Sequence, residues 1–444
     1  MRAIRRLICG VVVMAAMGAP ALAENRIDVI RPDAPALAAY GDQMVGVREL
    51  TLVHKDQIDI ANVTADMTAP DQMPRYDRPL PVELWYPADR EATGSTTLKA
   101  YMRDGKTLVD LHGKAMQDAA PAKTESGFPL VIISHGYPGN RFLMSPIAEN
   151  LASKGYVVVS IDHTDTTYST LRSFPSALVN RSEDQMFVLN EIARLSQDPD
   201  SFLNGLVDTA DTAIIGYSMG AYGTLVSAGI GLTDQAVEAK EGFWHAPAGT
   251  LERYRASSPA YRDRFDPRIK TAIVFAPAGY STGFFDDETL KGIRVPTLFI
   301  GGSNDDTVGY QNGVLPTFQG VKGVDRGFLV FEGANHNVGA PMPAPEEAWV
   351  YDPDLKFNLA MHYTDFVWDN VRMNNIATHF TTAWLGKYLK GDTAMQTYLD
   401  LVPVSNDGVY DMVDGRPAAD HTYWSGFQPR TAQALRFDFL SAEH

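Results

Sequence analysis

The stretch Thr212-Ala-Ile-Ile-Gly-Tyr-Ser-Met-Gly-Ala-Tyr-Gly223 decides the fold. Its first six residues are apolar or small, as in a strand that is buried on both faces, and small residues follow Ser218. A sharp turn from a strand into a helix crowds the backbone, and Gly216 and Gly220 would relieve that crowding on either side of the serine. The stretch therefore predicts a strand, a tight turn that exposes the Ser218 hydroxyl, and a helix.

The same alternation of strand and helix extends on both sides of this turn. Continuous apolar segments predict strands over residues 47–53, 82–86, 129–134, 156–161, 212–217, 269–276, 296–301 and 328–332. Segments with helical period predict helices over residues 142–153, 183–195, 221–230 and 371–390. We expect an α/β fold in which helices cover both faces of a mostly parallel sheet. In such a sheet the functional site lies at the carboxyl ends of the strands.

The N-terminal part of the chain is predicted to be a leader, an arm and irregular connections. Residues 24–444 are expected to form one domain, in which residues 24–79 supply an arm and the first strands. Polar, Pro-rich and Gly-containing composition predicts an extended arm over 24–45, a loop over 54–80 and an irregular excursion over 88–127.

Two long connections contain several aromatic residues. They span residues 231–267 and 337–370. Aromatic side chains in a long connection near the site would form a lid over an apolar substrate group. The alternative is that they pack the two insertions onto the body, and the sequence favours neither.

Residues 1–23 have the pattern of a secretory signal peptide. Three arginines precede a short apolar stretch, and Ala21-Leu-Ala23 forms a cleavage signal. A membrane anchor is the alternative, but the apolar run is shorter than the ~20 residues that a spanning helix needs. We therefore expect a periplasmic or secreted protein without a stable membrane anchor.

Cysteine content and charge exclude several classes of function. Cys9 is the only cysteine and lies in the leader, so the mature chain has no disulfide, thiolate nucleophile or cysteine-bound metal. The formal net charge is −16, and it becomes more negative when the leader arginines are removed. An acidic protein of this kind is a poor partner for nucleic acid or for anionic membranes.

Two other predicted strand ends carry groups that would activate Ser218. A serine hydroxyl needs a base, and His336 lies in the loop after the strand at 328–332. The base needs an acid, and Asp305 follows the strand at 296–301 with Asp306 as the reserve. The alternatives are a serine that only caps a helix, a loop histidine without a partner and an aspartate-rich turn.

Backbone amides near Ser218 would bind the charge that develops on a substrate oxygen. Met219, the residue after the serine, supplies one amide, and Tyr137 in the loop after the strand at 129–134 supplies the second. Gly136 lets this loop approach closely, and Pro138 has no amide to donate. We assign substrate binding to Gly136 and to Tyr217.

The other histidines are given structural roles. His163 is interpreted as a supporting residue near a strand end, and His379 as a surface or packing residue of the last helix. Asp162, His163 and Asp165 could hold a cation, but a strand-end turn is the simpler interpretation. No metal site and no cofactor are predicted, because the chain has no H-E-x-x-H motif and no compact ligand set.

Together these motifs resemble the α/β-hydrolase superfamily. The matching stretches are ISHGYPGN, VSIDHTD, GYSMGAYG, GGSNDD and GANHNVG, and the resemblance covers roughly residues 80–392. Within the superfamily the chain is similar to platelet-activating-factor acetylhydrolase-like and dienelactone hydrolase-like esterases. The order Ser218, Asp305, His336 matches the superfamily's order of nucleophile, acid and base.

Two departures separate the chain from these named enzymes. Platelet-activating-factor acetylhydrolases carry the acid after the strand that follows the nucleophile helix, where this chain reads Phe275-Ala-Pro-Ala278. Dienelactone hydrolases typically have a cysteine nucleophile, where this chain has Ser218. The resemblance implies serine ester hydrolysis without a cofactor, but not the substrate of either enzyme.

The expected function is therefore an exported serine carboxylic ester hydrolase that acts through an acyl-enzyme. Its partner is a small or polymeric ester, and neither the ester nor the oligomeric state can be read from the sequence. A serine peptidase or amidase on the same fold is one alternative. A non-catalytic binding protein on a hydrolase scaffold is the other.

Overall fold

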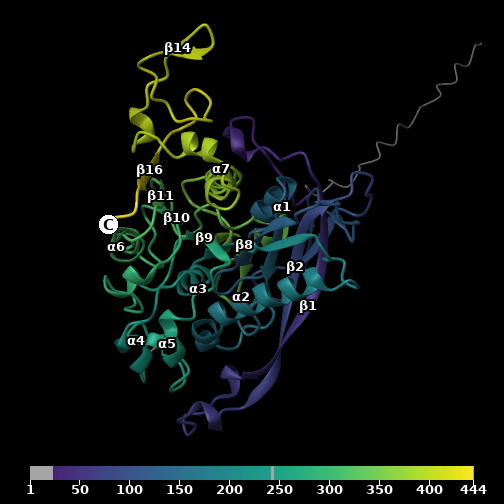
Figure 1. Ribbon diagram of the computed structural model, residues 1–444, viewed down its shortest axis with the longest axis vertical. Helices are drawn as coiled ribbons and strands as arrows, with labels where there is room; N and C mark the ends of the chain where they lie inside the picture. The colour runs from purple at the N-terminus through teal and green to yellow at the C-terminus, as the bar shows by residue number, and fades with distance from the viewer. Residues whose placement is uncertain (1–23, 242–244, 444) are drawn as a thin grey trace, which may run out of the picture.

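The computed structural model describes residues 24–241 and 245–443, so the predicted leader lies outside the described residues. A ten-stranded sheet runs through the molecule in the order β16-β11-β10-β9-β8-β6-β7-β2-β1-β5 (Figure 1). No helix in the described parts of the chain combines the length and apolar character that crossing a membrane requires.

Six neighbouring strands of this sheet run parallel and hold the core. They are β6 (Phe128–Ser134), β7 (Val157–Ile161), β8 (Val207–Tyr217), β9 (Ile269–Phe275), β10 (Thr297–Gly302) and β11 (Arg326–Phe331). Most of their residues are Val, Ile, Leu, Phe or Ala with almost no exposed surface, as parallel strands covered on both faces require. The predicted α/β class with a mostly parallel sheet is confirmed.

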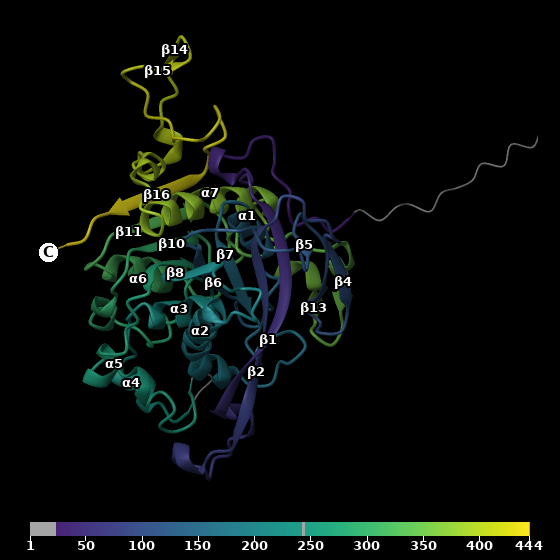
Figure 2. The same ribbon diagram turned by 45° about the vertical axis from the view of Figure 1, so that its right-hand side comes forward.

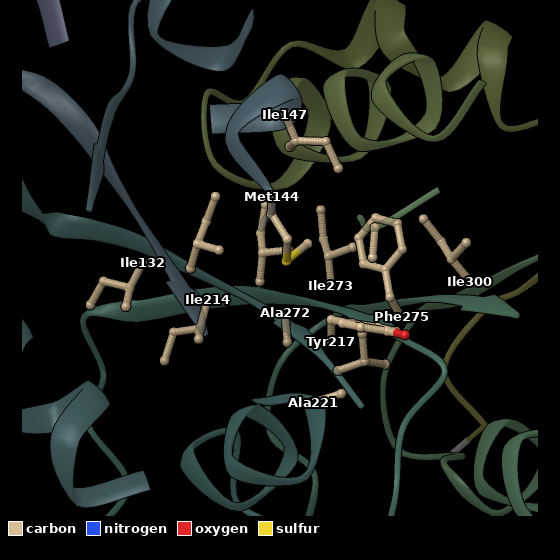
Figure 3. Packing of buried hydrophobic residues seen from close by; sticks show 14 of the residues in the cluster. Ile132, Met144, Ile147, Ile214, Tyr217, Ala221, Ala272, Ile273, Phe275 and Ile300 are labelled. Atoms are coloured by element: carbon tan, nitrogen blue, oxygen red, sulfur yellow. The ribbon is translucent and has the colours of Figure 1, made fainter. Parts of the chain in front are cut away.

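Helices cover both faces of these strands. On one face lie α1 (Ser145–Ser153) and α7 (Asn370–Tyr388), and on the other lie α2 (Phe174–Gln197) and α3 (Met219–Ser227) (Figure 1). In Figure 3, Met144 and Ile147 pack on one side of Ile273, and Ala221 lies on the opposite side of the sheet. Three short helices complete the set: α4 (Asp234–Glu238), α5 (Pro259–Arg262) and α6 (Leu315–Gly320).

The predicted loop over residues 54–80 is wrong at both ends. Strand β1 (Met44–Ile58) pairs antiparallel with β2 (Arg75–Ala88), and this hairpin projects beyond the body (Figure 1). Along the projecting part of β2, Arg78 and Leu80 are buried while their neighbours are exposed or half-buried. The charged residues and the two prolines of this stretch are typical of a loop, although its burial alternates as in a strand.

The excursion over residues 88–127 is also more regular than predicted. It contains the hairpin of β3 (Thr97–Tyr101) and β4 (Leu108–His112), followed by β5 (Met116–Gln117). A second hairpin, β12 (Tyr351–Asp352) with β13 (Phe357–Asn358), lies beside it (Figure 2). Lys106 and Asp354 join the two hairpins through an ion pair of 3.0 Å.

The C-terminal part of the chain adds an edge strand that the sequence analysis missed. Strand β16 (Leu435–Leu440) pairs antiparallel with β11 at the end of the sheet. Between α7 and β16 the chain forms an excursion that holds the short hairpin of β14 (Met412–Val413) and β15 (Arg416–Pro417) (Figure 2).

Candidate active site

The site is built around the turn between β8 and α3, where Ser218 has φ 55° and ψ −115°. Residues other than glycine rarely adopt a positive φ, so this conformation is strained and persists only because the surrounding structure imposes it. A Cβ at Gly216 would lie 2.4 Å from Thr224 Oγ1, and one at Gly220 would lie 2.0 Å from the Ser134 carbonyl oxygen. Both flanking positions therefore require glycine.

Two loops bring His336 and Asp305 to this serine. The Ser218 hydroxyl donates to His336 Nε2 over 2.9 Å, and His336 Nδ1 donates to Asp305 Oδ2 over 2.8 Å. His336 follows β11 and Asp305 follows β10, so three strand ends supply the three side chains. Asp306 is exposed and, within the described residues, forms no hydrogen bond or ion pair with the imidazole.

Asp305 is held in a charged state. Its side chain is buried, and its second oxygen, Oδ1, accepts the amides of Thr307 and Val308 over 2.9 and 3.0 Å. Burial raises the pKa of this carboxyl, but the charge and hydrogen bond of His336 and the two amides lower it more, so the net pKa lies below its usual value. A carboxylate on Nδ1 fixes the imidazole tautomer that leaves Nε2 free to accept a proton.

The loop after β6 passes directly over Ser218. A Cβ at Gly136 would lie 3.4 Å from the Ser218 Cβ and 3.1 Å from the Tyr217 ring, so glycine allows this approach. The Gly136 carbonyl accepts His135 Nδ1 over 2.7 Å and Arg181 Nη2 over 3.0 Å. In a trans peptide the next N–H points the opposite way, so the Tyr137 amide faces away from Arg181. The amide of Met219 begins α3 and has no acceptor within that helix.

Arg181 was not predicted as part of the site. It is fully buried in α2, and its Nη2 also donates to Thr166 Oγ1 over 3.0 Å. Burial lowers its pKa to about 9. The residue lies within a helix without any motif around it, so no sequence signal marks its position.

Ser218 opens into a cavity of about 470 Å³. The cavity is lined by Arg103, Tyr137, Pro138, Tyr217, Ser218, Asp306, Thr307, Asn335, His336, Asn337, Phe357, Met361, His362, Thr364 and Phe366. The Tyr217 hydroxyl donates to Asn337 Oδ1 over 2.9 Å, and Asn337 Nδ2 donates to the Thr364 carbonyl over 2.8 Å. These bonds tie the base of the cavity to its outer wall.

The two long insertions lie in different places. The segment 337–370 supplies Phe357, Met361 and Phe366 to the cavity wall. In the segment 231–267, the Tyr254 and Tyr261 hydroxyls donate to carbonyls of the body, at Val179 and Val226, over 2.6 and 2.7 Å. Phe243 and Trp244 of the same segment lie outside the described residues.

The remaining histidines have other partners. His163 is buried, with Nε2 2.8 Å from Ser134 Oγ and Nδ1 2.9 Å from Asp184 Oδ2. His379 is a packing residue with no exposed surface, so the surface alternative is wrong.

His163 and the aspartates beside it do not converge. Asp162 pairs with Arg141, and Asp165 pairs with Arg78. Across residues 24–241 and 245–443, no three carboxylate, histidine or cysteine side chains come together as a metal site would need.

A solved structure with a similar arrangement of strands and helices identifies the fold. Ferulic acid esterase from Streptomyces cinnamoneus aligns with a TM-score of 0.53 and 20% identity, over 94% of this chain and 100% of that chain. The chain has the α/β-hydrolase fold. The fold predicted from the motifs is therefore confirmed.

Sequence comparison relates this chain to esterases. Residues 41–198 match the family of platelet-activating factor acetylhydrolase, isoform II. A platelet-activating factor acetylhydrolase from Cavia porcellus is 31% identical over 129 residues, which are 28% of this chain and 30% of that protein. Cutinase 2 from Thermobifida cellulosilytica is 23% identical over 285 residues, 64% of this chain and 76% of that protein. The predicted resemblance to platelet-activating-factor acetylhydrolase-like esterases is confirmed, although the first relative is matched over less than a third of its length.

Proposed function

We propose that this α/β-hydrolase is a serine carboxylic ester hydrolase with Ser218 as nucleophile, His336 as base and Asp305 as acid. The chain of hydrogen bonds from the Ser218 hydroxyl through His336 to Asp305 carries the proposal. The esterases among its relatives support the reaction class. The substrate is a small or polymeric carboxylic ester that enters the cavity above Ser218.

In the first step the Ser218 oxygen attacks the ester carbonyl carbon. His336 Nε2 takes the hydroxyl proton, and the carbonyl π electrons move onto the oxygen. The amides of Met219 and Tyr137 stabilise this oxyanion, and each such donor is worth about 3 kcal/mol in the transition state. The C–O bond to the alcohol then breaks, and His336 returns its proton to the leaving oxygen.

In the second step water releases the acyl group. His336 takes a proton from the water while its oxygen attacks the acyl carbon. Collapse of the second tetrahedral intermediate breaks the bond to Ser218, which regains its proton from His336. Asp305 stays ionised throughout and stabilises the imidazolium that forms in both steps.

We also propose export through the leader of residues 1–23. A basic front, a short apolar stretch and a small-residue cleavage signal support it. Fractionation of cells that express the full chain, followed by N-terminal sequencing of the exported protein, tests this part. Retention of the uncleaved chain in the cytoplasm would contradict it.

Hydrolysis of short p-nitrophenyl esters by the purified protein tests the function. Ser218→Ala should reduce kcat by at least about 10⁴-fold, because the nucleophile is lost. A fluorophosphonate should label the wild type and not this variant. Undiminished turnover by Ser218→Ala would reject the assignment, and faster cleavage of p-nitroanilides than of esters would favour an amidase.

A further inference from the structure

Arg103 places a positive charge in the wall of the cavity that contains Ser218. It lies in the turn between β3 and β4, outside the ten-stranded sheet. The Tyr363 hydroxyl accepts its backbone N–H over 3.0 Å, which fixes this turn against the segment 337–370. The position of Arg103 is therefore set by two parts of the cavity wall.

The guanidinium of Arg103 is close to other residues of the wall. Its Cζ lies 5.6 Å from the centre of the Phe357 ring, and Phe357 lines the same cavity. Burial lowers the pKa of His362 to about 3, and the charge of Arg103 is the next cause of that decrease. The positive charge of Arg103 therefore acts on a residue that lines the cavity.

Several other arginines of this acidic protein pair with carboxylates. Arg141 pairs with Glu49, Glu83 and Asp162, and Arg78 pairs with Asp165 and Asp184. Within the described parts of the chain, the Arg103 guanidinium has no ion pair and no hydrogen bond, and it lies over the Phe357 ring. Its planar N–H donors are therefore available to a ligand, and that geometry suits a carboxylate.

We propose that Arg103 binds a carboxylate carried by the substrate, so that the preferred ester is a half-ester or another ester of an anionic molecule. This inference rests on the proposed ester hydrolysis at Ser218. The ester carbonyl lies at Ser218, and a carboxylate elsewhere in the same molecule accepts hydrogen bonds from the Arg103 guanidinium. Phe357, beneath the guanidinium, offers an apolar face to the part of the substrate between them.

One other charged group lines the cavity, Asp306. It follows β10 beside the proposed acid, whereas Arg103 lies in the β3–β4 turn. Asp306 is exposed, so its charge is screened by solvent more than that of the half-buried Arg103. The cavity thus has an acidic and a basic wall, and a substrate carboxylate is directed to the basic one.

Paired substrates of equal shape test the charge preference. In 4-acetoxybenzoate the group opposite the ester is a carboxylate, and in 4-acetoxybenzamide it is a neutral amide. We expect wild type to favour the acid in kcat/KM, and Arg103→Gln to reduce that ratio by about 10-fold or more, because a charged hydrogen-bonded pair is lost. Arg103→Lys should retain part of the preference. Arg90→Gln removes the same charge at an exposed position after β2 and should leave the ratio unchanged.

A second pair places the carboxylate on the acyl side, as the mono-p-nitrophenyl ester of adipic acid and its terminal amide. A preference that depends on Arg103 in either pair supports the proposal and tells which side of the ester faces Arg103. An acid-to-amide ratio that Arg103→Gln leaves unchanged in both pairs overturns it.

Binding to a Ser218→Ala background separates this inference from the reaction itself. Calorimetry should give weaker binding of 4-acetoxybenzoate when Arg103→Gln is added, with binding of the amide unchanged. Equal binding of acid and amide to Ser218→Ala overturns the inference even where ester hydrolysis is established. If instead no ester is hydrolysed but Arg103 still selects the acid, the proposed function fails and the anion site stands.

Discussion

Ser218 keeps a backbone conformation that a residue with a Cβ adopts at a cost. Its φ of 55° and ψ of −115° lie in a region favoured by glycine, and strain of this kind costs about 1–3 kcal/mol. The burial of β8 and α3 on either side holds the residue in place. The proposed nucleophile is therefore located where the fold is less stable than it could be.

Replacing Ser218 by glycine should raise stability while activity is lost. Ser218→Ala is the matched control, because it removes the same hydroxyl but keeps the Cβ. We expect the Gly variant to unfold at a temperature about 1–3 °C higher than the Ala variant, since relief of strain exceeds the entropy cost of glycine. Equal melting temperatures in calorimetry would show that the turn is not strained.

The adjacent aspartates offer a second test at single residues. Asp305→Asn should lower kcat by about 10³–10⁴-fold, because an amide in place of the carboxylate no longer fixes the Nδ1–H tautomer of His336. Asp306→Asn should cost at most a few-fold, since it does not touch the imidazole. Steady-state kinetics on a neutral ester measure both, and the reverse order would make Asp306 the acid.

Individual residues could be predicted where a strand led to them. Ser218, Asp305 and His336 each follow a continuous apolar strand, so the sequence predicted that their positions meet at one edge of the sheet. Arg103 and Arg181 had no such marker. Their roles depend on how a hairpin and a helix pack in three dimensions, which no local pattern records.

Among the elements, α2 has a contact that reaches the proposed catalytic site. Through Arg181 it holds the Gly136 carbonyl, and through the rigid peptide this contact sets the direction of the Tyr137 amide. Burying the Arg181 guanidinium without a carboxylate at hydrogen-bond distance costs free energy. The Gly136 carbonyl and the Thr166 hydroxyl, which accept its hydrogen bonds, offset part of that cost.

Removing the charge of the Arg181 side chain should therefore slow the proposed reaction. We expect Arg181→Gln to lower kcat by about 10-fold or more with little change in KM, because the oxyanion donor is needed mainly in the transition state. Arg181→Lys should recover part of the loss. Arg194→Gln, at an exposed position of the same helix, is the control. Parallel changes in kcat and melting temperature, with no recovery by Lys, would indicate a structural role only.

Elements were predicted well in the centre of the sheet and poorly at its edges. Central strands are apolar without interruption, so their sequence has one interpretation. The outer part of β2, the β3–β4 hairpin and β16 alternate buried with exposed residues over short stretches. Loops can show the same short alternation, so pairing with distant segments decides which of these stretches become strands.

At the scale of the whole molecule, distant segments of the chain meet at His379 in α7. The Leu37 amide of the N-terminal arm donates to its Nδ1 over 3.1 Å, and Tyr398 and Phe427 of the C-terminal part contact its ring. Burial and the nearby charge of Lys154 lower the pKa of His379 to about 3. The imidazole thus stays neutral when folded.

This junction should weaken in acid. In the unfolded chain His379 takes up a proton near pH 6.5 and in the folded protein only near pH 3, so the unfolded state binds more protons between these values. The free energy of unfolding should fall by about 1.4 kcal/mol per pH unit from this residue as pH drops below 6.5. His379→Asn retains an acceptor for the Leu37 amide but does not titrate. Its unfolding free energy, measured by denaturant titration from pH 7 to 4, should fall less steeply than that of wild type, and parallel curves would contradict the assignment.

The two hairpins joined by Lys106 and Asp354 have a consequence for how this protein can diverge. Each supplies one residue to the cavity wall, Arg103 and Phe357, yet neither hairpin belongs to the ten-stranded sheet whose strand ends carry the serine, aspartate and histidine. Mutations in the hairpins would alter the shape and charge that an incoming molecule meets, while the proposed catalytic groups stay in place. The residues of the two hairpins can therefore change without displacing the proposed catalytic residues, and substitutions in them are expected to alter which molecules the cavity accepts.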